Sequence, residues 1–510
     1  MIAALSPSPD LAMLLAVGLP LVGVLLIWLA DKSPNLREAA TLATGVILLI
    51  LTISVFAAVG AGERPETALF TVMGDLPIAF SAEPLGAMFG VIAAGLWLVN
   101  SVYSIGYMRG GHEKHQTRFY MCFAVAISAA MGVAYAANLF TLFLFYEILT
   151  LSTFPLVAHK GDDAARRGGR VYLGVLLATS IGLLLPAIVW TYVIAGSTDF
   201  TPGGLLALHV SEAAPVAGVL MALYAFGIGK AALMPVHPWL PNAMVAPTPV
   251  SAFLHAVAVV KAGVFSVLKV AVYIFGIDFL KITGASEPIM WIAAGSILLA
   301  SAIAMHQDNL KARLAYSTVS QLSYVTLGAM LATSMGVMGG AVQIAAHALA
   351  KITLFMCAGA VYVKTHKTLI SEMRGLGRAM PVTFGAFFIG AMSIVGLPPM
   401  AGSWPKFFLM LGAADAGELA IIAVLVVSSI LNVVYLLGVP AQAFYLAPAP
   451  TGEKARGIGE SETAPMRWAS LEEAPLLCVL PPVLTAVGAF LLFFFADGLF
   501  AYLAPIAGGK

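Results

Sequence analysis

Residues 138–156 read NLFTLFLFYEILTLSTFPL, an apolar run that is long enough to cross a lipid bilayer and contains one charged side chain, Glu147. A spanning helix needs about 20 mainly apolar residues, and a carboxylate inside one is costly to bury. Of the 25 acidic residues in the chain, the other 24 fall in loops or near the ends of apolar runs. Glu147 is therefore a candidate functional residue. The alternatives are a glutamate that is protonated in the core and one that reaches a membrane surface.

The rest of the chain has the same apolar character. Of its 510 residues, 60% are hydrophobic and 10% are charged, whereas soluble domains contain about 25% charged residues. This composition predicts an all-α, polytopic membrane protein. The net charge of +1 gives no reason to expect a nucleic-acid partner. Cys122, Cys357 and Cys478 form neither a CxxC pair nor a disulfide framework, so we expect small buried apolar residues.

Polar or Pro/Gly-rich breaks divide the chain into fourteen candidate membrane spans. The N-terminal sequence MIAALSPSPD lacks the basic region of a secretory signal, so the first span is expected to be retained. The predicted spans are 11–30, 40–60, 84–106, 119–136, 138–158, 171–195, 214–235, 249–275, 288–305, 314–333, 336–362, 383–412, 419–445 and 474–503.

Basic residues in the loops support this division and predict an orientation. Alternate loops, beginning with 31–39, hold 18 of the 26 Lys and Arg residues, whereas the opposite loops and tail hold Arg64, Lys281 and Lys510. Cytoplasmic loops carry an excess of basic residues, so both termini are expected outside a bacterial inner (plasma) membrane. The two longest loops, 61–83 outside and 446–473 in the cytoplasm, are too short for a catalytic domain.

The remaining five basic residues are all lysines within predicted spans. Lys230 lies in FGIGKAALMPVHPWLP (226–241), where Pro235, Pro238 and Pro241 are expected to break the helix shortly after the lysine. Broken helices inside a membrane occur where backbone lines a cavity or a site. The alternative is a lysine at a helix end that reaches the interface.

The eighth predicted span adds three ionisable residues in or after SAFLHAVAVVKAGVF (251–265). Lys261 is near the middle of the span, and His255 is either a proton relay or a hydrogen-bonded core residue. Lys269 is nearer the outer end, where a lysine can extend to the interface, so it is not assigned a role.

Two further lysines lie in later spans. His347 and Lys351, in HALAK (347–351), share one helix face and form either part of a proton path or a structural contact with a loop carbonyl. Lys406 follows Pro405 in SIVGLPPMAGSWPKFFLM (393–410), where Pro398 and Pro399 interrupt a second span.

The two interrupted spans lie at corresponding places in two groups of five, spans four to eight and nine to thirteen, which predicts a structural repeat. Because five is an odd number, the second group enters the membrane from the opposite side, so the repeats are expected to be inverted. The second group lacks a glutamate at the place of Glu147. The spacing from Glu147 to Lys230, counted back from Lys406, ends near Ser323. The predicted organisation is helices one to three, the first repeat, the second repeat, and a cytoplasmic loop with the last helix. The corresponding ranges are 1–118, 119–275, 288–445 and 446–510.

The residue types in these spans suit proton movement. Burial disfavours the protonated form of a lysine and a nearby carboxylate favours it, so a shifting Glu147 would switch the proton affinity of Lys230. Arginine stays protonated and occurs in none of the predicted spans. We therefore predict a relay from Glu147 and Lys230 through Lys261 with His255, then His347 with Lys351, to Lys406.

Long blocks of the sequence resemble the antiporter-like subunits shared by respiratory complex I and Mrp-type cation/proton antiporters. The resemblance covers roughly residues 80–445 and rests on four blocks. They are NLFTLFLFYEILTLSTFPLVAH (138–159), PVHPWLPNAMVAPTPVSAFLHAVAVVKAG (235–263), KARLAYSTVSQLSY (311–324) and HALAKITLFMCAGA (347–360).

The resemblance implies that proton movement uses a glutamate in the fifth span and lysines in the seventh, eighth and twelfth. These roles fall on Glu147, Lys230, Lys261 and Lys406, and His255 and His347 match the central histidines of the family. Residues 396–410 and 472–492 look most similar to the D-type chains of Mrp antiporters, and a long C-terminal lateral helix is not expected. A lysine at 406, where the complex I subunit of similar size has a glutamate, favours Mrp.

The sequence therefore predicts a proton-translocating subunit of a hetero-oligomeric Mrp-type antiporter that exchanges sodium, or another monovalent cation, for protons. No cofactor or metal is expected, because phosphate-loop, cysteine-cluster and haem motifs are lacking. One rival is a proton pump in complex I or a membrane-bound hydrogenase, which partner subunits with iron–sulfur clusters would indicate. A second rival is a non-conducting scaffold, which unchanged transport after replacement of Glu147 or Lys230 would indicate.

Overall fold

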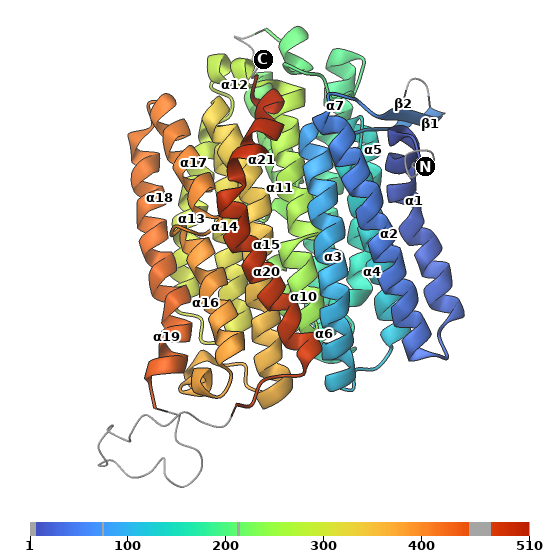
Figure 1. Cartoon of the computed structure of the whole chain (residues 1–510). Helices are drawn as coiled ribbons and strands as arrows, with labels where there is room; N and C mark the ends of the chain where they lie inside the picture. The colour runs from blue at the N-terminus through green and yellow to red at the C-terminus, as the bar shows by residue number, and fades with distance from the viewer. Residues whose placement is uncertain (1–6, 74–75, 212–214, 448–470, 509–510) are drawn as a thin grey trace.

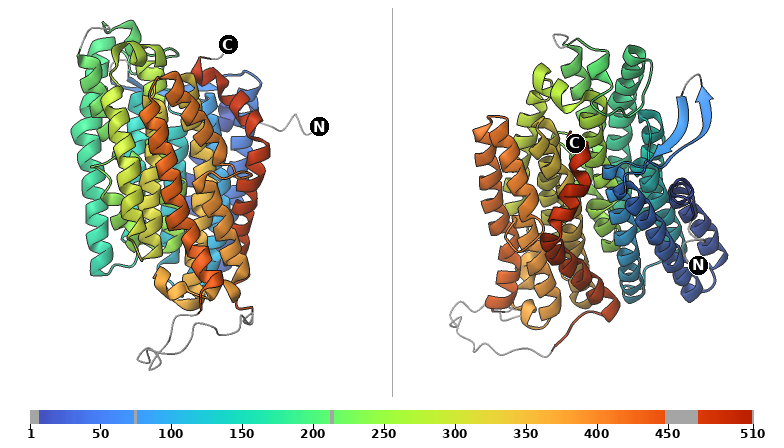
Figure 2. Two further views of the ribbon diagram at one scale, coloured as in Figure 1. Left: turned by 90° about the vertical axis from the view of Figure 1, so that its left-hand side faces the viewer. Right: turned by 45° about the horizontal axis from the view of Figure 1, so that its top comes forward.

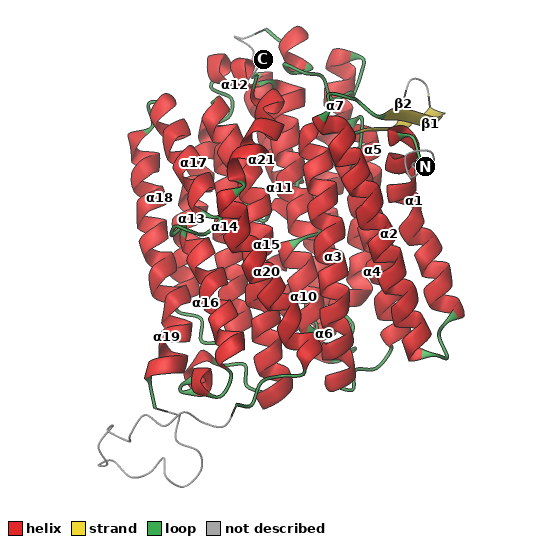
Figure 3. Cartoon of the chain, viewed as in Figure 1, coloured by secondary structure: helices red, strands yellow, loops and turns green. Residues whose placement is uncertain are grey.

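The computed structural model describes residues 7–73, 76–211, 215–447 and 471–508, without the side chains of Met73 and His255. These residues form a bundle of nearly parallel helices (Figures 1 and 3). The helices are α1 (Pro9–Leu29), α2 (Pro34–Gly60), α3 (Pro84–Gly110), α4 (Gln116–Ala134), α5 (Leu139–Val157), α6 (Asp163–Thr179), α7 (Leu185–Ala195), α8 (Val216–Gly227), α9 (Trp239–Asn242), α10 (Thr248–Ala256), α11 (Val259–Lys269), α12 (Ile277–Thr283), α13 (Glu287–Met305), α14 (Leu310–Met330), α15 (Ser334–Thr365), α16 (Pro381–Val395), α17 (Ser403–Asp415), α18 (Leu419–Asn432), α19 (Gly438–Tyr445), α20 (Leu476–Phe494) and α21 (Ala496–Leu503).

The predicted membrane fold is confirmed. Eleven helices in the described ranges are long and apolar enough to cross a membrane. Of the other three predicted spans, two are the interrupted ones, and the third is α14, whose many Ser, Thr and Gln residues lower its hydropathy. Several spans contain π-helical segments, namely η1 (Ser180–Leu184) between α6 and α7, η5 (Val270–Phe275) after α11, and η8 (Val433–Leu437) between α18 and α19.

The loop 61–83 contains a β-hairpin that the all-α prediction missed. Strands β1 (Glu66–Met73) and β2 (Leu76–Ser81) pair antiparallel and project at one end of the bundle, which we call the hairpin end (Figure 1). The sequence signal is a pair of short apolar runs on either side of Gly74 and Asp75, a combination that favours tight turns. The opposite end, where the loops 31–33, 111–115 and 306–309 lie, is called the basic end.

The helices follow the chain from one edge of the bundle to the other (Figure 2). Helices α1 and α2 lie at one edge and α18 and α19 at the other, while α20 crosses the front obliquely. Helix α15 runs through the centre, packs against α3, α10, α14, α16, α17 and α20, and is buried along most of its length. Its first turn is fixed by Thr333, whose hydroxyl accepts a hydrogen bond from the Gly336 N–H.

The first helix break begins earlier than the sequence predicted. Helix α8 ends at Gly227, three residues before the lysine, and Lys230 lies in the single 3-10 turn η3 (Gly229–Ala231). Ala232, which follows, has a left-handed φ of 52°, and Pro235 and Pro238 keep the chain out of helix until α9. The backbone change therefore precedes the prolines and places Lys230 inside the break.

The second break comprises residues 396–402, between α16 and α17. Pro398 and Pro399 lie within it, and Gly396 has a φ of 88° at the end of α16. Pro405 does not break the helix, because it lies in the first turn of α17, where a backbone N–H has no intrahelical partner. Each break contains one cis peptide bond, Met234–Pro235 in the first and Pro398–Pro399 in the second.

Helix α11 packs directly on the first break through Gly263. A Cβ atom at this position would lie 2.7 Å from the carbonyl oxygen of Lys230, and closer still to the carbonyl carbon of Lys230 and the nitrogen of Ala231. We expect Gly263→Ala to destabilise the protein by about 1–3 kcal/mol through overpacking. Gly295→Ala, on an open face of α13, is the matched control and is expected to leave the melting temperature unchanged or slightly higher. Equal melting temperatures of the two variants would show that the break does not depend on this contact.

Candidate functional site

Lys230 is fully buried against α5. Its Nζ donates hydrogen bonds to the carbonyl oxygen of Tyr146 (2.8 Å) and to Oγ1 of Thr150 (2.5 Å), and lies 3.1 Å from the centre of the Tyr146 ring. The Lys230 backbone N–H also donates to the Tyr146 hydroxyl (3.0 Å). The amine is thus held by neutral oxygen atoms and an aromatic face, and it does not reach the interface.

Glu147 does not form an ion pair with Lys230 in the described structure, since no carboxylate lies within 4.0 Å of this lysine. Both Glu147 carboxylate oxygens are buried and lack a hydrogen-bond partner among the described residues. The residue is half-buried, and Leu151, one turn further along α5, is 56% exposed. Tyr146, and not Glu147, therefore makes the direct contact with Lys230, while the Glu147 carboxylate oxygens are enclosed within the bundle.

Lys261 and His347 join α11 to α15. Lys261 Nζ lies 2.5 Å from His347 Nδ1, and both side chains are buried. This contact has room for one hydrogen, so one nitrogen donates while the other accepts. Lys351, one turn along α15 from His347, brings a second amine to the same face. Since like charges oppose each other, the two amines and the imidazole disfavour protonation of all three groups together.

Lys351 connects α15 to α14 through two hydrogen bonds. Its Nζ donates to Ser317 Oγ (2.6 Å) and to the Leu314 carbonyl oxygen (3.2 Å), both on α14. The Tyr435 hydroxyl donates to the same Ser317 oxygen (3.1 Å) and also contacts Asn432 Oδ1. The carbonyl that holds Lys351 belongs to helix α14 and not to a loop, and a part for Lys351 in a proton path stays a prediction.

Ser317→Ala is expected to slow proton transport about tenfold, because it removes the oxygen that links Lys351 to Tyr435. Ser323→Ala is the matched control on the same helix, since the Ser323 hydroxyl donates to the Val319 carbonyl of α14 itself. Proton uptake by vesicles that contain the purified assembly measures the difference. Equal rates for the two variants would remove Ser317 from the path.

Lys406 occupies the second break in a similar way. Its Nζ donates to the Val395 carbonyl oxygen (2.7 Å) and to Ser429 Oγ (3.0 Å), and lies 5.2 Å from the ring centre of Tyr324. Ser429 is three residues before Asn432 on α18, so the two side chains lie one turn apart. Ser429, which contacts Lys406, is thus one helical turn from Asn432, which is linked to Lys351 through Tyr435 and Ser317.

These contacts make an interrupted polar line through the middle of the bundle. It runs from Lys261 through His347, Lys351, Ser317, Tyr435 and Asn432, and after one helical turn continues at Ser429 and Lys406. Lys230 lies near the other end of this line. Its peptide group packs against Gly263, which is two residues from Lys261 on α11. Two steps in this line lack a direct contact, Lys230 to Lys261 and Asn432 to Ser429.

Lys269 does not extend to the interface as the sequence suggested. It is 1% exposed, and its Nζ donates to the Ala136 carbonyl oxygen (2.8 Å) and lies 3.4 Å from Glu83 Oε1. Glu83 also accepts hydrogen bonds from the N–H groups of Leu85 and Gly86 at the start of α3. The Lys269–Glu83 pair therefore joins α11 to the start of α3 at the hairpin end, with the lysine buried and the carboxylate partly exposed.

Of the five buried lysines, only Lys269 has a carboxylate within 4.0 Å in the described structure. The other four are satisfied by carbonyl groups, hydroxyl groups, a histidine and aromatic rings. A buried amine without a counter-ion gains little by staying protonated, so these groups suit transient protonation. No group of three or more His, Cys, Asp and Glu side chains forms a potential metal site within the described ranges.

The structure brings together most of the predicted residues and adds neighbours that the sequence analysis missed. The His255 side chain lies outside the described residues, and its backbone belongs to α10. The added residues are Tyr146, Thr150, Ser317, Tyr324, Ser429, Asn432 and Tyr435. For α14 a signal was present, namely the polar residues within KARLAYSTVSQLSY, which are unusual in a span. For Tyr435 and Ser429, the sequence gives no comparable signal.

The sequence of this chain matches a known protein family and several curated proteins. The family described as "NADH:quinone oxidoreductase/Mrp antiporter, TM" matches residues 136–432. NADH-quinone oxidoreductase subunit N of Desulforudis audaxviator is 30% identical over 90% of this chain and 89% of the relative. NAD(P)H-quinone oxidoreductase chain 5 of a Picosynechococcus strain is 31% identical over 65% of this chain, which spans half the length of that relative.

Two solved structures are similar along nearly their whole length. A chain of the Mrp complex from Dietzia sp. superposes with a TM-score of 0.85 at 22% identity, with 98% of this chain and 97% of the other covered. A chain of an archaeal membrane-bound sulfane sulfur reductase gives a TM-score of 0.83 at 22% identity, with the same coverage. At this identity, the two superpositions support a shared fold.

Proposed function

We propose, from the premise that this chain belongs to the NADH:quinone oxidoreductase/Mrp antiporter transmembrane family, that it conducts protons in a multi-subunit Mrp-type antiporter. The complex would exchange sodium, or another monovalent cation, for protons. The observation that carries the proposal is the line of buried, unpaired amines joined by His347, Ser317 and Tyr435. Groups that lack a counter-ion and contact one another in sequence can accept and release a proton in turn.

The two breaks have equivalent roles in this proposal. In each, a lysine lies against the ring of a tyrosine on an earlier helix, Lys230 on Tyr146 and Lys406 on Tyr324. This correspondence supports the assignment of residues 119–275 and 288–445 as two inverted five-helix repeats. Glu147 follows the first tyrosine and Val325 the second, so the carboxylate would serve one repeat only.

Partner subunits are expected at the Glu147 face of α5. Burial of the two Glu147 oxygens without a hydrogen-bond partner among the described residues is costly, and Leu151, one turn away on α5, is exposed. A neighbouring subunit that offers a polar or basic group would remove this cost. The complex would lie in the bacterial inner membrane, with the basic end in the cytoplasm and both termini outside.

A redox-driven complex is the second candidate, favoured by the names of the curated relatives, which are quinone oxidoreductase subunits. Lys406 supports the antiporter, because the resemblance associates a lysine there with Mrp. Purification of the native assembly and identification of its other chains tests both. Small multi-span subunits and sodium-dependent proton uptake support the antiporter, whereas iron–sulfur subunits and quinone-dependent uptake would replace it with the redox complex.

A further inference from the structure

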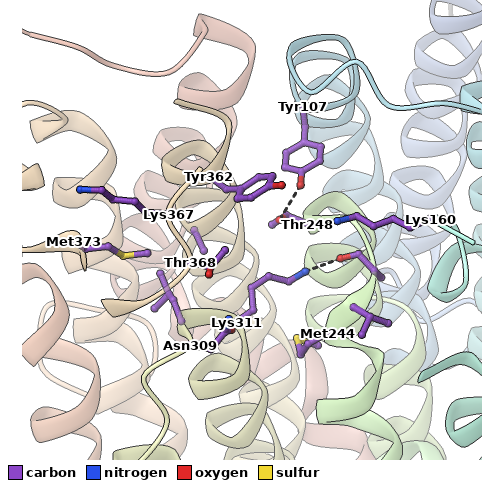
Figure 4. Close-up of a pocket in the computed structure, with 14 residues that line it drawn as sticks. Tyr107, Lys160, Met244, Thr248, Asn309, Lys311, Tyr362, Lys367, Thr368 and Met373 are labelled. Carbon is purple, nitrogen blue, oxygen red and sulfur yellow. Dashed lines mark hydrogen bonds between the residues drawn. The ribbon is translucent and has the colours of Figure 1, made fainter. Parts of the chain in front are cut away.

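A polar cavity lies at the basic end of the bundle, away from the line of buried lysines (Figure 4). Its volume is about 260 Å³. It is lined by the end of α3, the start of α10, the start of α14 and the last turns of α15, together with residues that follow α5 and α15. The cavity therefore adjoins segments from both proposed repeats.

Two lysine side chains enter this cavity from opposite sides. Figure 4 shows the Lys311 and Lys160 ammonium groups directed toward each other. Lys311 Nζ donates to the Ala246 carbonyl oxygen (2.6 Å), whereas Lys160 Nζ forms no hydrogen bond or ion pair with another described residue. Lys367 also lines the cavity, but its Nζ donates to the Glu372 carbonyl oxygen (3.0 Å). No Asp or Glu is among the described lining residues, so the converging charges lack a counter-ion within the cavity.

Further donors add to this positive potential. Helices α10 and α14 begin at the cavity wall, at Thr248 and Leu310, and a helix N-terminus carries partial positive charge. The hydroxyl groups of Tyr107, Thr248 and Thr368 line the same space, with Thr248 donating to Tyr107 (3.4 Å). Such a set of donors suits a tetrahedral oxyanion, which accepts several hydrogen bonds at once.

We propose that this cavity binds a phosphate group, carried by an anionic lipid headgroup or by free inorganic phosphate. The anion lies between the Lys160 and Lys311 ammonium groups and neutralises their repulsion. It joins the segment after α5 to the start of α14, and Leu314, one turn further along α14, holds Lys351 through its carbonyl oxygen. Binding therefore stabilises the junction of the two halves without taking part in proton transfer.

The test is the melting temperature of the purified native assembly, titrated with either inorganic phosphate or short-chain phosphatidylglycerol. Chloride at equal ionic strength and phosphatidylcholine are the controls for charge screening and for lipid in general. Ligands that bind only the folded protein raise its melting temperature with concentration. We expect a saturable rise for wild type and at least about a tenfold higher half-saturating concentration for K160Q/K311Q.

Glutamine preserves a donor for the Ala246 carbonyl, so the variant removes charge with little loss of packing. K32Q/K114Q, with two exposed lysines at the same end of the bundle, is the matched control and should respond like wild type. Should K160Q/K311Q fail to assemble, Lys160→Gln alone changes an exposed residue and should weaken binding about threefold. A rise with phosphate identifies free anion as sufficient, and a rise with phosphatidylglycerol alone identifies a lipid headgroup. No saturable rise with either ligand, or equal half-saturation in both double variants, overturns the proposal.

Discussion

Replacement of Lys230 by methionine is expected to reduce proton transport by about 100-fold or more, while the assembly remains intact. Methionine has a similar length and is apolar, so the buried site between α5 and the first break stays filled. What is lost is the one titratable group that contacts both Tyr146 and Thr150. Proton uptake into vesicles, followed with a pH-sensitive dye, measures the loss.

Lys230→Arg separates proton exchange from fixed charge. Arginine keeps the positive charge and the hydrogen-bond donors but does not release its proton, so this variant should be as inactive as Lys230→Met. Lys281→Met, an exposed lysine at the hairpin end, is the matched control and should transport like wild type. Normal transport in the arginine variant would mean that Lys230 supplies only a fixed positive charge and does not exchange a proton.

Lys261 and His347 are expected to act as a unit. Because their nitrogen atoms lie 2.5 Å apart, removal of either one breaks the same step. Lys261→Met and His347→Leu should each slow transport by about 100-fold, and the double variant should be no slower than the slower single variant. The three rates, with that of wild type, form a double-mutant cycle.

Independent roles would give a different result in that cycle. If the two residues contributed independently to transport, the effects of the single variants would multiply in the double variant. The controls for the individual changes are Lys281→Met and His306→Leu, both at exposed positions. Normal transport in His347→Leu would show that Lys261 passes its proton elsewhere.

The order of the spans and the burial of four of the five span lysines were predictable because both follow from local composition, whereas Lys269 was expected nearer the interface. A run of about 20 apolar residues has few folds available in lipid, and a charge within it is conspicuous. The β-hairpin was missed because the charge and length of loop 61–83 do not distinguish paired strands from an irregular loop. The start of the first break was misplaced because Gly227 and Ala232 change the backbone before Pro235 does.

The contacts among the site residues were not predictable in the same way. Lys351 and Ser317 are 34 residues apart and Ser317 and Tyr435 are 118 apart, so their proximity depends on how α14, α15 and η8 pack. The expected Glu147–Lys230 contact is absent from the described structure for a related reason. Neighbouring residues on a helix point in directions about 100° apart, and Tyr146 is the one that points at Lys230.

The account depends most on its two steps without direct contact, from Lys230 to Lys261 and from Asn432 to Ser429. A proton crosses such steps only if water bridges them. A cryo-electron microscopy map of the native assembly in lipid, at a resolution that shows ordered water, tests this directly. We predict water density that connects the side chains across both steps. Two dry steps closed by apolar side chains would contradict a continuous proton path through this chain.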